Sequence, residues 1–244
     1  VMESFVSGKA SKVTAIFLFA LLPRLITTAL FTYDYHLGVI IGAVLTLLFI
    51  QYFNKSATEK FKTGVKSVRP FAIFTLAVAI FALQFIFLFL SFRTGGLTVD
   101  NNWLTYEKII GTIIIAPFAE EIIFRWALTE TCIDNSTGKF KKILFVFLSL
   151  IVWNFVHTKS ITSINVAVIV LGLFFYIIYF KTENIFYCII AHIAANLFAR
   201  IMTSPLQSKL LFLCENNIFI IFAAIILIIS TLCFLKSAKR QNRA

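Results

Sequence analysis

The sequence alternates long apolar runs with short polar breaks, a pattern that predicts helices crossing a membrane. A spanning helix needs about 20 mostly apolar residues. Runs such as 218–235 are apolar on every side, unlike the alternating strands of a membrane β-barrel. We therefore expect an all-α fold, a polytopic membrane helical bundle of about eight transmembrane helices that forms a single domain over residues 1–244. The predicted spans lie near residues 13–31, 37–53, 70–92, 109–128, 143–157, 164–180, 185–203 and 217–235.

The composition supports a location in the membrane. Of the 244 residues, 60% are hydrophobic and 14% are charged, whereas a soluble domain has roughly 45–50% apolar and about 25% charged residues. This balance excludes a water-soluble globule. The four cysteines show neither a C-x-x-C pair nor metal-finger spacing, so we expect them to be reduced residues of the packed interior.

The positive charge is explained by membrane topology. A net charge of +11 would suggest a nucleic-acid partner in a soluble protein. Here fifteen lysines and arginines fall on one side of the eight predicted spans and four on the other. Because cytoplasmic loops carry the excess of basic residues, we expect a multi-pass protein of the cell membrane with both termini in the cytoplasm and no nucleic-acid partner. Residues 13–31 are expected to be an uncleaved first span, because Pro23 and Arg24 interrupt the run and no cleavage site follows.

The fourth predicted span contains three ionisable residues, Glu120, Glu121 and Arg125. Such groups are costly inside a bilayer and are functional candidates by default. Glu121 and Arg125 are four residues apart, so we expect them to share one helix face and to neutralise each other in a structural role. Glu120 projects from a different face, where a carboxylate could accept a proton near neutral pH.

Two of the three histidines also lie in predicted spans, His157 in the fifth and His192 in the seventh. Asn196 follows His192 by four residues, so both side chains project from the same helix face. A carboxylate, an imidazole and a His/Asn donor pair are the groups needed to activate water and to stabilise an oxyanion. Simpler roles are an interfacial position for His157 and interhelical hydrogen bonds for His192 and Asn196.

Three short motifs carry these residues in a fixed order. Residues 120–125 fit E-E-x-x-x-R, residues 153–157 fit F-x-x-x-H with Trp153 in place of phenylalanine, and residues 192–196 fit H-x-x-x-N. Together they resemble the CAAX protease and bacteriocin-processing (CPBP, or Abi) family of intramembrane glutamic-type endopeptidases. Trp153 departs from the phenylalanine of the motif, but it is also aromatic, so an aromatic wall would be kept at this position of the site.

The resemblance implies a role for each of these residues. Glu120 and His157 would position and deprotonate a water that attacks a peptide carbonyl. His192 and Asn196 would stabilise the developing oxyanion. The residues that would support the site are Glu121, Arg125 and Trp153.

The activity implied by the resemblance is that of a CAAX-type endopeptidase acting on a peptide or a small membrane-associated protein near the cytoplasmic face. In a bacterium this activity would serve maturation of a bacteriocin or pheromone, or self-immunity. A prenylated C-terminal motif is the substrate of eukaryotic relatives. The alternative is a non-catalytic membrane scaffold or immunity protein of the same fold, in which the motifs are relics.

The same residues leave a choice between metal-free and metal-dependent chemistry. Glu120, His157 and His192 form a set of two histidines and one carboxylate, which is also a catalytic zinc arrangement. However, the sequence has no H-E-x-x-H helix, and the carboxamide of Asn196 is a poor zinc ligand but a good oxyanion donor. We therefore expect an enzyme without a cofactor, with zinc bound by the three residues as the alternative.

The predicted boundaries leave a mismatch in depth. At about 1.5 Å per residue, Glu120 lies roughly 14 Å from the cytoplasmic edge and His157 roughly 21 Å. The two side chains would meet if the fifth helix begins before residue 143, as the basic segment 139–142 permits, or if it tilts strongly.

Overall fold

The computed structural model describes residues 8, 11–16, 18, 35–95, 108–134, 136–158, 164–204 and 207–239. Within these ranges the regular structure is helical and no β-strand occurs. The predicted all-α class is therefore confirmed. Most of the predicted first span, 13–31, lies outside the described residues. All four cysteines are free thiols, as expected.

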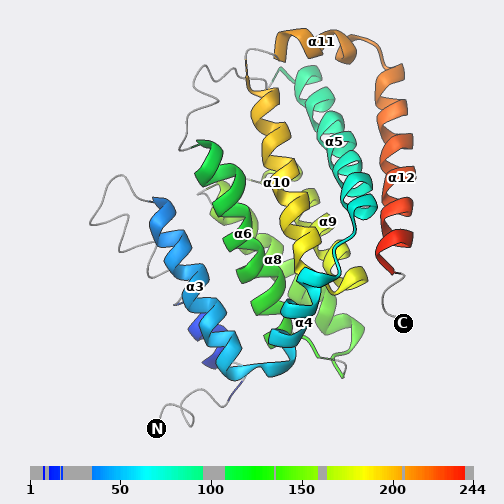
Figure 1. Cartoon of the computed structure of the whole chain (residues 1–244). Helices are drawn as coiled ribbons and strands as arrows, with labels where there is room; N and C mark the ends of the chain where they lie inside the picture. Colours follow the sequence, from blue (N-terminus) through cyan, green and yellow to red (C-terminus); the bar gives the residue numbers. More distant parts are fainter. Residues whose placement is uncertain are drawn as a thin grey trace. The chain divides into compact units, whose positions relative to one another are not determined.

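Six of the predicted spans coincide with well-defined α-helices (Figure 1). Two further helices, α4 (Lys55–Lys66) and α11 (Gln207–Glu215), occupy segments that hydropathy alone leaves between spans. The six helices are α3 (Tyr35–Phe53), α5 (Pro70–Arg93), α8 (Lys139–Thr158), α9 (Val166–Thr182), α10 (Ile185–Met202) and α12 (Ile218–Lys239).

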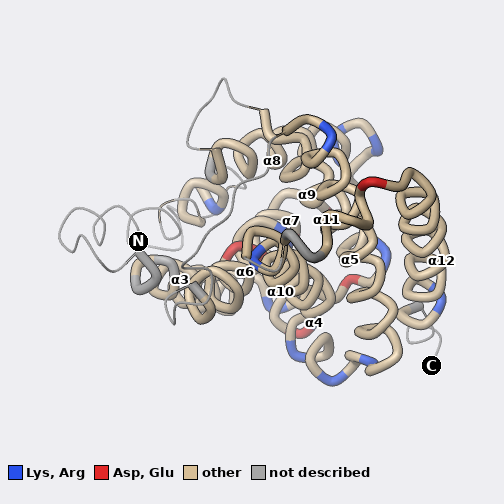
Figure 2. The backbone as a smooth tube through the Cα atoms, turned by 90° about the horizontal axis from the view of Figure 1, so that it is seen from above, with Lys and Arg blue, Asp and Glu red and all other residues tan. Residues whose placement is uncertain are grey.

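Fewer helices than predicted are long and apolar enough to cross a membrane. Among the described residues three qualify, in α5, α10 and α12, and α3 with α4 adds a fourth if this pair, bent by 119°, is one span. In Figure 2 α12 runs mostly in the colour of uncharged residues. Helix α9 has only 17 residues, and three lysines in the first turn of α8 shorten its apolar run. The predicted eight spans are therefore not confirmed, and the described residues contain three or four helical segments that meet this test.

The chain divides into two compact units, each made from two separate stretches. The first comprises Val1–Val65 and Phe118–Cys188, and the second comprises Lys66–Pro117 and Ile189–Ala244. In the first unit α8 and α9 form an antiparallel hairpin, in which Ser149 of α8 bonds to Tyr176 of α9. In the second unit α5 runs beside α12 (Figure 1), and the apolar core includes Leu88, Phe89 and Met202.

Asn54 fixes the bend between α3 and α4. Its side-chain oxygen accepts a hydrogen bond from the backbone N–H of Ala57 at 3.0 Å, which caps the start of α4. Its amide group donates to the backbone carbonyl of Glu130 at 3.2 Å. The turn is therefore tied both to its own helix and to a distant segment of the first unit.

Residues 108–132 are helical throughout but change their hydrogen-bonding register. Two π-helical turns, η1 (Lys108–Ile115) and η2 (Ile122–Ala127), flank the α-helical α6 (Ala116–Glu121), and α7 (Leu128–Cys132) follows. Pro117 explains the first change, because proline has no N–H to donate and its ring crowds the carbonyl four residues earlier. A wider π turn before the proline relieves this conflict. The predicted span 109–128 is thus helical but not a regular α-helix.

Candidate active site

The first unit brings together Glu120 and His157, two of the predicted reactive residues. Glu120 lies near the end of α6, and His157 lies near the end of α8. The distance from Glu120 Oε2 to His157 Nε2 is 3.7 Å, and the two side chains are 14% and 28% exposed. Helix α8 begins at Lys139 rather than near residue 143. Helix α8 thus begins at the basic segment 139–142, and the side chains of Glu120 and His157 meet.

The other ring nitrogen of His157 fixes its orientation. Nδ1 lies 2.9 Å from the backbone carbonyl of Trp153. A carbonyl can only accept, so this contact requires the proton on Nδ1 and leaves Nε2 of a neutral imidazole as an acceptor facing Glu120. An ionised Glu120 is also an acceptor, and 3.7 Å is too long for a direct hydrogen bond. One water molecule could donate to both atoms.

Behind this pair lies the expected ion pair of Glu121 and Arg125. Arg125 Nη1 is 3.2 Å from Glu121 Oε1, and both side chains are fully buried. Arg125 also donates through Nη2 to the carbonyl of Gly172 at 3.5 Å. The two charges thus neutralise each other in the interior, where an isolated charge is costly.

Trp153 lies between this ion pair and the histidine. The Cζ atom of Arg125 is 3.9 Å from the centre of the Trp153 ring, a cation–π contact. The ring centres of Trp153 and His157 are 4.3 Å apart. The ring of Phe124 packs edge-on against the same indole, with 5.4 Å between the ring centres. The buried ion pair is therefore connected through Trp153 to the imidazole.

The remaining predicted residues, His192 and Asn196, belong to the second unit and lie on α10. His192 is 4% exposed. Asn196 donates from its amide nitrogen to the carbonyl of Thr112 at 2.7 Å. In a π turn this carbonyl would pair with the residue five positions on, which is Pro117 and has no N–H. The side chain of Asn196 therefore provides the hydrogen-bond donor that Pro117 lacks. The second N–H of this amide group is not used in that bond.

Some supporting residues were not anticipated from the sequence. A Cβ atom on Gly172 would lie 2.7 Å from Leu150 Cδ2 and 3.1 Å from Trp153 Cδ1, so glycine permits the close approach of α9 to α8. Gln84 donates from α5 to the carbonyl of Ala195 at 3.2 Å. Gln84 could have been identified from the sequence, because a polar glutamine stands out within an apolar run. Gly172 could not, because glycine is common in apolar runs.

The geometry of Glu120 and His157 suits either of two chemistries. Glu120 Oε2 and His157 Nε2 can both accept hydrogen bonds from one water molecule and so orient it. They can also ligate a metal ion such as Zn²⁺, because carboxylate oxygen and imidazole nitrogen are ordinary zinc ligands. The carbonyl of Trp153 bonded to Nδ1 orients the imidazole for either role.

Comparison with known proteins finds a similarity to one family in the part of the chain that carries the site. Residues 102–198 match the family model described as type II CAAX prenyl endopeptidase Rce1-like. No curated protein and no solved structure matches the chain. The matched segment includes all seven predicted site residues, on both units. Over residues 102–198 the chain is therefore similar to the Rce1-like family of type II CAAX prenyl endopeptidases, consistent with the resemblance carried by the order of its three motifs.

Proposed function

We propose that the protein is an intramembrane endopeptidase in which Glu120 and His157 activate a water molecule. The observation that carries this proposal is the 3.7 Å separation of Glu120 Oε2 and His157 Nε2, with the imidazole proton held on Nδ1 by the Trp153 carbonyl. Two acceptors at this separation orient the two protons of one water and leave its oxygen lone pair for attack. The similarity of residues 102–198 to this endopeptidase family supports peptide-bond hydrolysis.

The proposed reaction balances without a further reactant. The water oxygen attacks the peptide carbonyl carbon, one water proton passes to the Glu120–His157 pair, and the carbonyl π electrons move to oxygen. His192 and Asn196 stabilise this oxyanion by donating N–H groups, a role that rests on the motif resemblance. The C–N bond then breaks, and the proton held by the pair passes to the leaving amine.

We further propose the arrangement in the membrane. The eight apolar runs and the excess of basic residues on one side favour eight spans in the cell membrane, with both termini in the cytoplasm. The substrate in this proposal is a peptide or small membrane-associated protein cleaved near the cytoplasmic face. Maturation of a bacteriocin or pheromone, self-immunity and processing of a prenylated C-terminus are the three candidate uses of this activity.

The direct experiment uses the full chain reconstituted in lipid vesicles. A library of internally quenched peptides, each with and without a C-terminal prenyl cysteine, is incubated with the protein and with Glu120→Gln. Glu59→Gln is the matched control, since its carboxylate is exposed and paired with Lys62 on α4. We expect cleavage by the unmutated protein and by Glu59→Gln but not by Glu120→Gln.

The alternative function is a non-catalytic membrane scaffold or immunity protein. It retains the fold, binds a partner through its spans and does not use the motifs. Under this alternative Glu120→Ala and His192→Ala keep full biological activity at unchanged stability, and no peptide of the library is cleaved.

We propose that hydrolysis is independent of metal. The chain's own acceptors suffice to orient water, and Asn196 suits an oxyanion better than a zinc ion. The alternative is zinc held by Glu120, His157 and His192. Activity that is lost to a strong chelator and restored by added zinc, with stoichiometric metal in the purified protein, would establish that alternative.

A further inference from the structure

The first unit contains a cavity of about 870 Å³ whose lining does not include Glu120 or His157. Its walls come from α8, α9 and the segments that contain Lys60 and Glu130. A volume of this size falls within the range of small-molecule sites, about 300–1,000 Å³. One end of the cavity is charged and the other is apolar.

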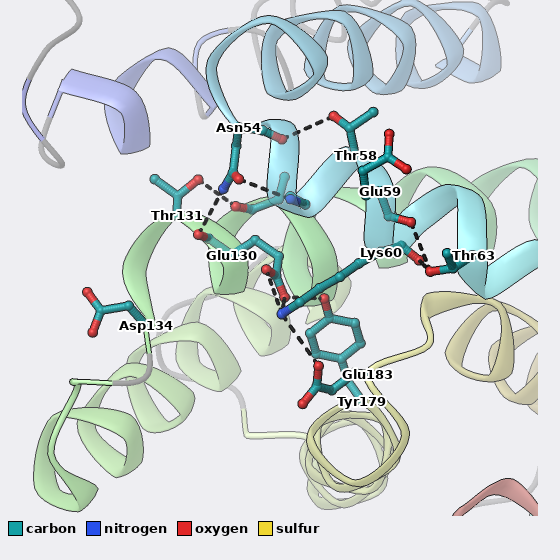
Figure 3. A network of polar contacts seen from close by, with 12 residues as sticks. Asn54, Thr58, Glu59, Lys60, Thr63, Glu130, Thr131, Asp134, Tyr179 and Glu183 are labelled. Atoms are coloured by element: carbon teal, nitrogen blue, oxygen red, sulfur yellow. Dashed lines mark hydrogen bonds and ion pairs between the residues drawn. The ribbon is translucent and has the colours of Figure 1, made fainter. Parts of the chain in front are cut away.

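The charged end is organised around Lys60 (Figure 3). Lys60 Nζ lies 3.2 Å and 3.1 Å from the two carboxylate oxygens of Glu130 and 3.5 Å from Glu183 Oε2. Tyr179 donates its hydroxyl to Glu130 at 2.7 Å. Lys60 is thus held between two carboxylates, at a point where α4, α7 and the end of α9 meet.

Charges of both signs line this end of the cavity. Besides Lys60, the lining includes one further cation, Lys142, and three carboxylates, those of Glu130, Asp134 and Glu183. Glu183 follows α9 in the left-handed region at φ 50°, a position that favours glycine or asparagine. Its carboxylate is 60% exposed and accessible to a ligand.

The apolar end is continuous with the outer surface of α8 and α9. Phe147, Leu173 and Ile177 line the cavity and are also 59%, 43% and 41% exposed. From Lys142 to the buried Leu150, both of which line the cavity, α8 rises about 12 Å at about 1.5 Å per residue. A hydrocarbon chain can therefore enter from the apolar surface and lie along the hairpin.

We propose that this cavity binds a zwitterionic membrane phospholipid with a primary amine in its headgroup, of the phosphatidylethanolamine type. One acyl chain lies between α8 and α9, and the phosphate lies toward Lys142 and Lys60. The ammonium N–H groups donate to the exposed carboxylate of Glu183. A choline headgroup has no N–H to donate, and a purely anionic headgroup would face three carboxylates with no cation of its own.

The test is photocrosslinking in vesicles of the full, unmutated chain. Three phospholipid probes carry the same diazirine on the acyl chain and differ only in having an ethanolamine, choline or glycerol headgroup. We expect the ethanolamine probe to label peptides containing residues 143–150 and 173–180 several-fold more than either other probe. Equal labelling by all three would show only surrounding bilayer lipid and overturn the proposal.

A matched pair of variants locates the bound chain. Ile177→Trp fills the cavity, whereas Ile225→Trp makes the same change on α12, where the side chain has a similar exposure of 46%. We expect the ethanolamine-specific labelling to disappear in Ile177→Trp and to persist in Ile225→Trp. Undiminished labelling in a folded Ile177→Trp protein contradicts the proposal. Because the headgroup comparison needs no substitution and no protease activity, this test is independent of the proposed function.

Discussion

Arg125 links the buried ion pair to the candidate reactive pair. On one side it contacts Glu121 at 3.2 Å, and on the other it lies 3.9 Å from the Trp153 ring centre. Trp153 in turn contacts the imidazole of His157. Any change that displaces the guanidinium is therefore expected to alter the support of His157 as well as the stability of the unit.

The two neighbouring glutamates are expected to respond differently to the same substitution. Glu121→Gln leaves Arg125 buried without a counter-charge, at a cost of about 3–5 kcal/mol by analogy with other broken buried pairs. Glu120→Gln keeps the side-chain volume but cannot accept a proton, so turnover is lost while stability is nearly unchanged. Thermal unfolding in detergent, with expression level, measures the first effect, and peptide cleavage measures the second.

A double variant is the control for the ion pair. Glu121→Gln with Arg125→Met removes both charges and is expected to recover much of the lost stability, since paired removal of buried charges is often neutral. Equal expression and equal inactivity of Glu120→Gln and Glu121→Gln would contradict the division of roles.

Gly172→Ala is expected to destabilise the α8–α9 hairpin although alanine is the better helix former. The new methyl group would lie 2.7 Å from Leu150 Cδ2, 3.1 Å from Trp153 Cδ1 and 3.2 Å from Arg125 Nη2. Overpacking of this kind costs about 1–3 kcal/mol, more than the gain in helix propensity of about 0.8–1 kcal/mol. A lower melting temperature is the expected result, and the loss caused by Gly172→Ala should be smaller in a Leu150→Ala background than in the unmutated protein. An unchanged or higher melting temperature for Gly172→Ala would show that the hairpin adapts.

At the scale of elements, the hydropathy pattern predicts where helices occur better than it predicts their internal geometry. The helices α5, α9 and α10 begin and end within two residues of the predicted spans. The π turns around α6 cannot be predicted from hydropathy, because apolar runs carry no information on hydrogen-bonding register. Pro117 is the one residue in the sequence that indicates where the register changes. Helix α4 is missed because its lysines resemble a polar break, yet Ala57 and Gly64 bury one side of it.

Asn54 is expected to control the bend between α3 and α4. Asn54→Ala removes both the cap on Ala57 and the bond to the Glu130 carbonyl, and loss of a cap alone costs about 0.5–2 kcal/mol. Asn54→Asp keeps the cap acceptor and loses only the donor. Melting temperatures in detergent should therefore fall in the order unmutated, Asp, Ala. Equal values for the Asp and Ala variants would show that the cap contributes nothing.

At the scale of the whole molecule, the sequence indicates the candidate reactive residues more completely than it indicates the contacts that support them. Glu120 and His157 are identifiable because ionisable residues are rare in apolar runs, and the structure places them 3.7 Å apart. The contact of Arg125 with Trp153 joins two helices across the loop between them, and no local pattern predicts it. The eight apolar runs likewise indicate more spans than helix length and composition support in the described residues.

The claim that Glu120 and His157 act on the same water is tested most directly by a double-mutant cycle. The turnover number kcat is measured on one cleaved peptide for the unmutated protein, Glu120→Gln, His157→Gln and the double variant in the same vesicles. Groups that act as a unit show strongly non-additive losses. We expect the double variant to be no slower than the slower single variant. Losses that multiply, or a single variant that retains full turnover, would contradict it.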